Sequence, residues 1–435
     1  MLTQRLYHIV TRSALPLARV YLRKRARKQP EYLEHWDERF GTVSYPAPRQ
    51  GRPRLWLHAV SLGETLASRG LIETFLAEFP EADLLLTCMT PTGRDAGGRI
   101  ARAYEEGRVQ QCYLPYDTPE LMGKFLDETR PTLGILMETE VWPNLIEQAR
   151  LRGVDLILAN ARESEKSARQ ARRFGWLMRP AFAGFQTVLA QTEADASRLR
   201  LLGAKSVHVC GSVKFDIRPN EAQREEAKKV REAWGRPVIL LASTRVGEEP
   251  QFLRAIAAEP VEPQANAVVV LVPRHPQRFD EVAEMIEAAG LSYVRRSSCA
   301  DLAELADDVQ VVLGDSLGEM SFYCALADVC IMGGSYGNFG SQNLIEPAAA
   351  GAPVLVGPSS FNFAKAVDDA VTIGGAERMR DAKQAWSSAK RWLIDGTLAE
   401  RSRRAMQFAQ TYTGATERQM EWIRDLWLKN LSATH

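Results

Sequence analysis

The sequence lacks any long apolar run. No stretch reaches the roughly 18–20 uninterrupted apolar residues of a membrane-spanning helix, and no small-residue cleavage site marks the N-terminus as a signal peptide. The six cysteines form no CxxC pair and mostly lie inside apolar runs. This pattern argues against a disulfide framework or a zinc site, and it predicts reduced core thiols in a cytoplasmic protein.

Metal-ligand patterns are also missing. No histidine or carboxylate cluster has the spacing of metal ligands, and no DxD sequence follows an apolar run of strand length. The sequence therefore predicts no metal site.

Acidic residues are absent from positions 1–28, which carry eight basic residues. Because the whole chain has a formal charge of +1, the remaining residues carry −7. This asymmetry argues against a nucleic-acid-binding protein and indicates a local anionic partner. The apolar residues of this segment recur at helical spacing: Leu2, Leu6, Ile9, Val10, Leu17, Val20 and Tyr21. Such a helix fits an anionic membrane surface and, equally, a core-packing helix with solvated arginines.

The length of 435 residues favours two hydrophobic cores over one. From Leu55 onward, short apolar runs alternate with helix-length stretches, which is typical of parallel sheets covered by helices. The predicted strands are 55–60, 84–88, 112–114, 133–137, 155–159, 187–190, 207–210, 238–242, 267–272, 309–313, 329–332 and 353–356.

A polar, helix-like connection at 216–235 separates the two sets of strands. The sequence therefore predicts an α/β protein in three parts: a basic N-terminal region (1–40), a first Rossmann-like domain (41–215) and a second Rossmann-like domain that ends in helices (216–435).

Polar or glycine-rich clusters follow most of these apolar runs, where ligands bind to open parallel sheets. Glu64 follows the first strand at the start of a helix. By spacing alone it fits either a general base on a rigid corner or a helix-terminal glutamate stabilised by the dipole. Lys214 fits either a cation for a phosphate or carboxylate, or a surface lysine at the domain boundary. The glycines of GGSYGNFGSQN fit a phosphate-binding loop or a plain loop.

The motifs HAVSLGET, METEVWPN, NARESEKS, VKFD, PRHPQRF and the EP of NLIEPAAAG occur in this order. Together they resemble the Kdo transferases of lipopolysaccharide assembly, and the resemblance runs from the basic N-terminal helix to Asn362. It implies a GT-B glycosyltransferase, in which two Rossmann-like domains face each other across a cleft. It also implies inverting transfer of 3-deoxy-D-manno-octulosonic acid (Kdo) from CMP-Kdo to a lipid A precursor (lipid IVA). No cofactor is implied, and the expected location is the cytoplasmic face of the bacterial inner membrane.

The resemblance also implies site residues. Glu64 is expected to be the base, Glu138 to stabilise the transition state and Lys214 to meet the leaving phosphate or the donor carboxylate, whereas Glu140 is expected to be structural. The residues expected to bind CMP-Kdo are Pro273, Arg274, Leu317, Gly318, Glu319, Asn343, Leu344, Ile345 and Glu346. Two family histidines are missing, because GGHN appears as Gly340–Asn343 and STHEGE as Ser243–Glu248. The resemblance therefore implies no role for those two positions.

Two other functions stay open. A UDP-sugar epimerase of the same architecture would have no use for the basic helix. A non-catalytic, two-lobed sugar-binding protein would usually be exported, and the sequence shows no export signal.

Overall fold

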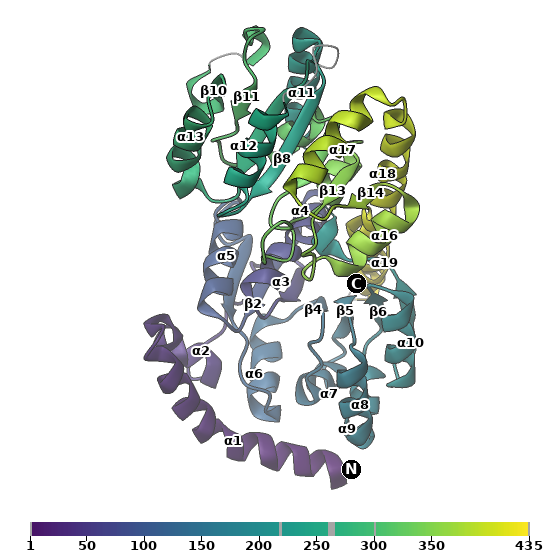
Figure 1. Cartoon of the computed structure of the whole chain (residues 1–435). Coiled ribbons are helices and arrows are strands. Elements are labelled where there is room, and N and C mark those ends of the chain that lie inside the picture. The colour runs from purple at the N-terminus through teal and green to yellow at the C-terminus, as the bar shows by residue number, and fades with distance from the viewer. Residues whose placement is uncertain (1, 217–219, 260–265, 300–301, 434–435) are drawn as a thin grey trace. The chain divides into compact units, whose positions relative to one another are not determined.

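The computed structural model describes residues 2–216, 220–259, 266–299 and 302–433, except for the side chains of residues 2–4 and 215. The chain forms two compact units (Figure 1). Unit 1 comprises Met1–Asp216 and Gly414–His435, and unit 2 comprises Ile217–Thr413. Each unit is built on a parallel sheet that has seven strands among the described residues. The predicted α/β class is therefore confirmed.

The sheet of unit 1 has the order β3-β2-β1-β4-β5-β6-β7. Its strands are β1 (Arg54–His58), β2 (Asp83–Cys88), β3 (Val109–Tyr113), β4 (Leu133–Met137), β5 (Asp155–Ala161), β6 (Thr187–Ala190) and β7 (Val207–Val209). Its helices are α1 (Leu2–Ala26), α2 (Trp36–Phe40), α3 (Leu62–Ala67), α4 (Arg69–Glu78), α5 (Pro91–Ala101), α6 (Pro119–Thr129), α7 (Pro143–Leu151), α8 (Glu165–Arg173), α9 (Gly175–Phe182), α10 (Glu193–Leu201) and α19 (Ala415–Ala433). Short 3-10 helices are η1 (Pro30–Leu33) and η2 (Val213–Phe215).

The sheet of unit 2 has the order β10-β11-β9-β8-β12-β13-β14. Its strands are β8 (Val238–Thr244), β9 (Val268–Pro273), β10 (Tyr293–Arg295), β11 (Val311–Leu313), β12 (Val329–Met332), β13 (Val354–Val356) and β14 (Ala376–Arg378). Its helices are α11 (Glu221–Trp234), α12 (Glu249–Ala258), α13 (Phe279–Ala288), α14 (Met320–Leu326), α15 (Ile345–Ala349), α16 (Ala364–Ile373), α17 (Ala382–Ile394) and α18 (Leu398–Tyr412). Its 3-10 helices are η3 (Pro276–Arg278), η4 (Arg296–Ser298) and η5 (Leu302–Glu304).

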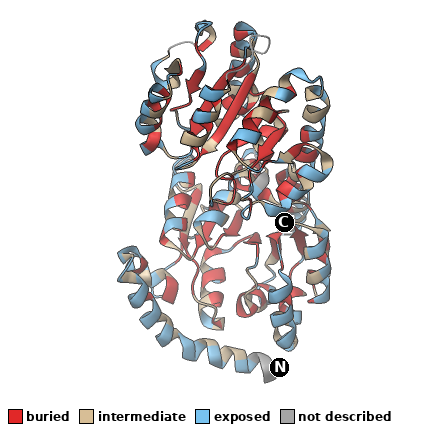
Figure 2. Cartoon of the chain, in the orientation of Figure 1, coloured by how far each residue is buried: buried red, intermediate tan, exposed pale blue. Residues whose placement is uncertain are grey.

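The central strands are buried on both faces, as the red strands in Figure 2 show. In unit 1, Trp56 lies in the core on one face of the sheet, and Leu57 lies in the core on the other. Unit 2 has a core of its own, in which Trp386 and Trp392 of α17 are fully buried. Continuous apolar runs form these strands because a parallel sheet covered on both faces exposes neither side to water.

Several helices begin directly at the end of a strand because their first residues favour a helix start. The side chains of Thr90 and Thr118 accept hydrogen bonds from the first turns of α5 and α6, and a proline follows each threonine. Proline also begins α7, after Trp142. Threonine caps and prolines at the first helical position satisfy or remove backbone N–H groups that lack helical partners. The connections after β2, β3 and β4 are thereby fixed at the carboxyl edge of the sheet.

The last helix belongs to a different domain from the one that the sequence predicted. The prediction placed residues 216–435 in one domain, but Gly414–His435 belong to unit 1. Met420, Ile423 and Trp427 of α19 are buried in the unit 1 core, and the Trp427 ring meets Phe75 edge to face at a centroid distance of 4.9 Å. Burial of this apolar face holds α19 on unit 1, and the sequence pattern of the helix does not specify which core it joins.

Helix α1 (Figure 1) is attached to unit 1 through both apolar and polar contacts. Leu22 is 2% exposed and packs with Tyr32 and Phe40. The Tyr7 hydroxyl donates to Asp117 (2.9 Å), and His8 pairs with Glu147 (3.0 Å). The exposed side carries most of the predicted apolar stripe: Leu6, Ile9, Val10, Leu17, Val20 and Tyr21 are each more than half exposed. The side chain of Leu2 lies outside the described residues. None of the helices that the structure describes is both long enough and apolar enough to cross a membrane.

Candidate active site

Glu64 lies in the first turn of α3, directly after β1. The backbone N–H of Val60 donates to Glu64 Oε2 (2.6 Å), and the Ser61 hydroxyl donates to Oε1 (3.3 Å). Burial raises the pKa of Glu64, and the Glu138 charge raises it further, whereas the Val60 and Ser61 hydrogen bonds and Lys214 oppose the rise. The carboxylate is thus held at a fixed point and is more basic than a free glutamate.

Glu138 follows β4 and is 3% exposed. Its carboxylate pairs with Lys214 of η2 (2.6 Å) and with Arg162 after β5 (3.1 Å). Its backbone has a φ of +57°, in the left-handed region that a glutamate rarely adopts. The strand-end position and the two cations together hold this acid in a strained conformation, of the kind that clusters at functional sites.

Glu140 joins the same cluster. The indole N–H of Trp142 donates to Glu140 Oε2 (2.6 Å). Burial raises the pKa of Glu140 to about 7, and the charges of Glu64 and Glu138 add to the rise, although the Trp142 hydrogen bond opposes it. Glu64, Glu138 and Lys214, predicted from separate motifs, thus come together with Glu140, for which only a structural role was expected.

Two further residues fix the position of Lys214. Asn160, at the end of β5, accepts a hydrogen bond from the Val213 N–H through its side-chain oxygen (3.1 Å). The Asn160 N–H in turn donates to Gln419 of α19 (3.0 Å). Sequence reasoning did not single out either residue. Asn160 could have been found from its place after an apolar run, whereas no local signal connects Gln419 to a strand far away in the sequence.

Unit 2 contains a cavity of about 320 Å³ at the carboxyl ends of its strands. Seven of the nine residues predicted to bind the donor line it: Pro273, Arg274, Leu317, Gly318, Glu319, Asn343 and Glu346. The other two, Leu344 and Ile345, are core residues with almost fully buried side chains. Gln342 also lines the cavity, at one of the positions where the family histidine is missing.

The charged groups of this cavity have different environments. Arg274 is exposed, and its backbone N–H donates to the Thr244 carbonyl (2.9 Å). Burial opposes ionisation of Glu319, but hydrogen bonds from Arg296 and Ser316 hold its pKa below the usual range. Burial raises the pKa of Glu346, which accepts a hydrogen bond from Ser321 (3.2 Å). Arg274 can therefore meet an anion, and Glu346 can accept hydrogen bonds from hydroxyl groups.

For the glycine-rich loop, phosphate binding and a plain loop were the two alternatives, and three of its N–H groups have a protein partner instead of a free position for phosphate. The buried carboxylate of Glu248 accepts hydrogen bonds from the N–H groups of Gly334, Tyr336 and Gly337, at 2.7–3.2 Å. Since these donors are occupied, the acid folds the loop against the end of β8 instead. The sequence could not show this, because Glu248 lies in a different motif.

No group of three or more histidine, cysteine, aspartate or glutamate residues in the described ranges could hold a metal ion. The charged groups that the two sites offer are the cluster around Glu138 in unit 1 and Arg274, Glu319 and Glu346 in the unit 2 cavity.

Comparisons with known proteins identify the family. Residues 34–217 match the model of the 3-deoxy-D-manno-octulosonic-acid transferase (kdotransferase) family. The 3-deoxy-D-manno-octulosonic acid transferase of Bordetella pertussis is 44% identical over 432 residues, which cover 97% of this chain and 99% of that protein. The transferase of the same name from Haemophilus influenzae is 32% identical over 379 residues, which cover 85% of each chain.

A solved structure agrees on the fold. The putative UDP-N-acetylglucosamine 2-epimerase of Listeria monocytogenes is 13% identical, covers 87% of this chain and 98% of its own, and has a TM-score of 0.52. At this identity the likeness concerns the fold alone, which in both chains consists of two Rossmann-like domains of the GT-B type. The chain therefore belongs to the 3-deoxy-D-manno-octulosonic acid (Kdo) transferase family and is a glycosyltransferase.

Proposed function

We propose that this protein transfers Kdo from CMP-Kdo to a hydroxyl of a lipid A precursor, with inversion at the anomeric carbon. The observation that carries the proposal is the cluster of Glu64, Glu138 and Lys214 at the carboxyl edge of the unit 1 sheet. It supports acid–base and electrostatic chemistry in a chain whose relatives are named as Kdo transferases.

Glu64 is the proposed base. The acceptor hydroxyl loses its proton to the Glu64 carboxylate as its oxygen bonds to the anomeric carbon of Kdo. The bond from that carbon to the phosphate oxygen breaks at the same time, and CMP leaves with the electron pair. A raised pKa favours this role, because a more basic carboxylate takes a proton more readily as long as it is ionised.

Lys214 and Glu138 are proposed to act as a pair. The two oxygens of Glu138 fix Lys214 and Arg162, and its negative charge also suits the positive charge that develops at the anomeric carbon. Lys214 is proposed to meet the phosphate or the carboxylate of the donor. In unit 2, Arg274 is proposed to bind the phosphate, and Glu346 the ribose hydroxyls. We expect these cations to act without a metal ion.

Helix α1 is proposed to hold the protein on the cytoplasmic face of the inner membrane. Its exposed apolar stripe suits acyl chains, and its exposed arginines suit anionic headgroups. A lipid acceptor stays in the bilayer, so an enzyme that modifies it must work at that surface.

The test is incubation of the full chain with CMP-Kdo and a tetraacylated lipid A precursor, with and without EDTA, followed by mass spectrometry. We expect one or more Kdo additions and an equal amount of released CMP in both samples. Loss of transfer in EDTA would overturn the metal-independent mechanism. A parallel incubation with UDP-N-acetylglucosamine tests the epimerase alternative, and an epimer formed there, with no transfer from CMP-Kdo, would overturn the proposed function.

A further inference from the structure

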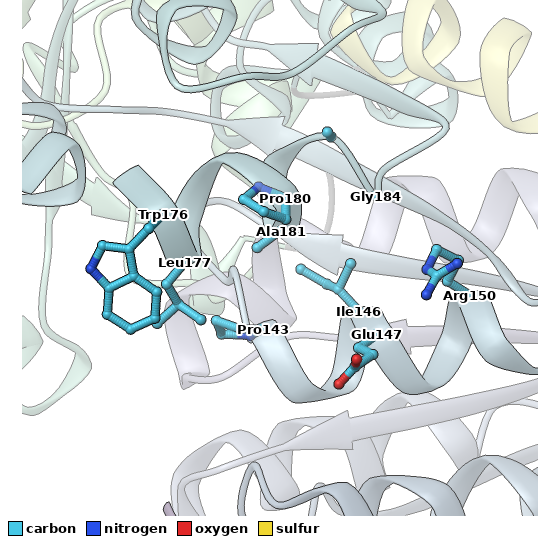
Figure 3. Close-up of a pocket in the computed structure, with 10 residues that line it drawn as sticks. Pro143, Ile146, Glu147, Arg150, Trp176, Leu177, Pro180, Ala181 and Gly184 are labelled. Carbon is cyan, nitrogen blue, oxygen red and sulfur yellow. The ribbon is translucent and has the colours of Figure 1, made fainter. Parts of the chain in front are cut away.

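A groove in unit 1 lies between α7 and α9, apart from the carboxylate cluster. Its volume is about 400 Å³, within the range of roughly 300–1,000 Å³ that is usual for ligand pockets. Pro143 and Ile146 of α7 face Leu177, Pro180 and Ala181 of α9 across the groove (Figure 3). The side chains that face each other there are apolar, and Glu147 and Arg150 of α7 line the rest of that wall.

One end of the groove adjoins the candidate active site. Helix α7 begins at Pro143, directly after Trp142, whose indole N–H donates to Glu140. Trp176, which is 44% exposed, lies toward the same end as Pro143, whereas Arg150 and Gly184 lie at the other (Figure 3). The groove therefore leads away from the carboxylates along the two helices.

The surroundings of the groove combine apolar and charged groups. Helix α1 contacts α7 through the His8–Glu147 pair and through a hydrogen bond from the Asn144 amide to Thr11 (3.2 Å). These contacts place α1 beside α7, and the apolar stripe of α1 lies on its exposed side. Arg150, which is exposed, and Glu147 also line the groove. The apolar walls and the neighbouring helix α1, with its exposed apolar stripe, are complementary to an acyl chain of a lipid.

We infer that the groove between α7 and α9 binds one acyl chain of the lipid acceptor. The identity of the acceptor rests on the proposed function. An apolar chain in this groove leaves the sugar headgroup at the end near Trp142, beside Glu140 and the carboxylate cluster. The groove therefore selects an acylated acceptor over a deacylated one and positions its hydroxyl for Glu64.

The first test locates the chain directly. A tetraacylated lipid A precursor with a diazirine at the end of one acyl chain is placed in phosphatidylglycerol-containing vesicles with the full-length protein and irradiated. Mass spectrometry is expected to find crosslinks on α7 and α9, around Ile146, Leu177 and Ala183. Crosslinks confined to α1 or to other surfaces would overturn the inference.

The second test measures selectivity. Leu177→Asp introduces a charge into the groove wall, Leu177→Met keeps the wall apolar, and Leu201→Asp places the same charge on an exposed leucine of α10 outside the groove. We expect Leu177→Asp to raise the KM for the tetraacylated acceptor at least tenfold while leaving its kcat and transfer to a deacylated acceptor within twofold of wild type. Leu177→Met and Leu201→Asp are expected to behave as wild type. An equal loss for both acceptors would contradict the inference.

The two proposals can fail separately. Crosslinks in the groove without any transfer from CMP-Kdo would support the acyl-chain site and overturn the proposed function. Transfer to the lipid acceptor with crosslinks elsewhere, or with no effect of Leu177→Asp, would support the function and overturn the groove.

Discussion

At the residue scale, the proposed chemistry depends on Glu64. Replacement by glutamine keeps the shape and the hydrogen bond from Val60 but removes the basic oxygen. We expect Glu64→Gln to lower kcat by about 10²–10⁴-fold, the usual contribution of a general base, and to leave CMP binding within twofold. The measurement is initial-rate kinetics together with calorimetric titration of CMP. Glu106→Gln, at an exposed glutamate of the same unit, is the control. A Glu64→Gln enzyme that keeps a tenth of the wild-type rate would remove the base from the mechanism.

Glu140 gives a pH-dependent prediction for stability. Its pKa is raised from 4.5 to about 7, so the folded state favours the protonated form. This favourable contribution is complete below about pH 4.5 and is lost as the pH rises through 7. Above pH 7, the ionised Glu140 therefore costs the folded state free energy that a neutral glutamine does not cost.

We expect Glu140→Gln to be more stable than wild type by about 1–2 kcal/mol at pH 8, after allowance for partial exposure to solvent, and equally stable at pH 4.5. Urea denaturation at the two pH values, read by tryptophan fluorescence, measures the difference. The same stability gain at both pH values would show that burial does not shift the pKa of Glu140.

Charged groups at or shortly after the ends of apolar runs marked candidate site residues, such as Glu64, Glu138 and Arg274, because the carboxyl ends of parallel strands meet at one edge of a sheet. The roles expected of Glu64 and Glu138 came from the resemblance to the family. The sequence did not predict that Glu140 shares the electrostatic environment of Glu64, since this depends on burial and on the hydrogen bond from Trp142. It also could not show that Glu248 occupies the loop N–H groups, because that contact joins two distant motifs.

At the scale of elements, the long apolar strands were predicted well, but the short polar strands at the edges of the unit 2 sheet were missed. Strands β4, β6 and β12 have the predicted bounds. Strands β10 and β14 were missed because each has three residues, includes an arginine and lies at an edge of the sheet, where the surroundings do not require an apolar run. Helix α19 was predicted as a helix, but its place on unit 1 depends on which core offers a site for Trp427.

Helix α19 supports the site through Gln419. This side chain is fully buried, accepts the hydrogen bond of the Asn160 N–H and donates to the Gly211 carbonyl (3.3 Å). We expect Gln419→Leu to lower the free energy of unfolding of unit 1 by about 1–3 kcal/mol, because it leaves buried backbone groups without partners. Glu421→Leu, on the exposed side of the same helix, is the control. Chemical denaturation measures the loss, and equal stability of the two variants would contradict this role.

Helix α1 gives a second prediction at this scale. Leu6, Val10 and Leu17 are exposed on the helix, so replacing all three with serine does not disturb the core. We expect this triple variant to bind vesicles with 30% phosphatidylglycerol at least tenfold more weakly (about 1.4 kcal/mol), because less apolar surface enters the acyl chains. Flotation of vesicles is the measurement, and serine at the exposed Leu201 and Leu428 is the control. Unchanged flotation of the triple variant would leave α1 without a membrane role.

At the scale of the whole molecule, unit 2 is an insertion in unit 1. The chain leaves unit 1 after Asp216 and returns at Gly414, and the Gly414 N–H donates to the Asp216 carboxylate (2.7 Å). The points of exit and return are therefore adjacent. Unit 2 also has a hydrophobic core of its own, and every residue that lines its cavity belongs to it. A compact insertion with adjacent ends meets the usual conditions for folding alone.

We therefore expect a fragment of residues 217–413 to unfold cooperatively and to bind CMP with a Kd within about threefold of that of the full chain, since a factor of three is less than 1 kcal/mol. Calorimetric titration with CMP is the measurement, and Arg274→Ala in the same fragment is the control, with a loss of at least tenfold from its missing phosphate contact. Because Glu64, Glu138 and Lys214 lie in unit 1, the fragment is expected to bind nucleotide without transferring Kdo. A fragment that folds but binds CMP more than tenfold more weakly than the full chain would show that unit 1 contributes to nucleotide binding, and would remove the assignment of the nucleotide site to unit 2 alone.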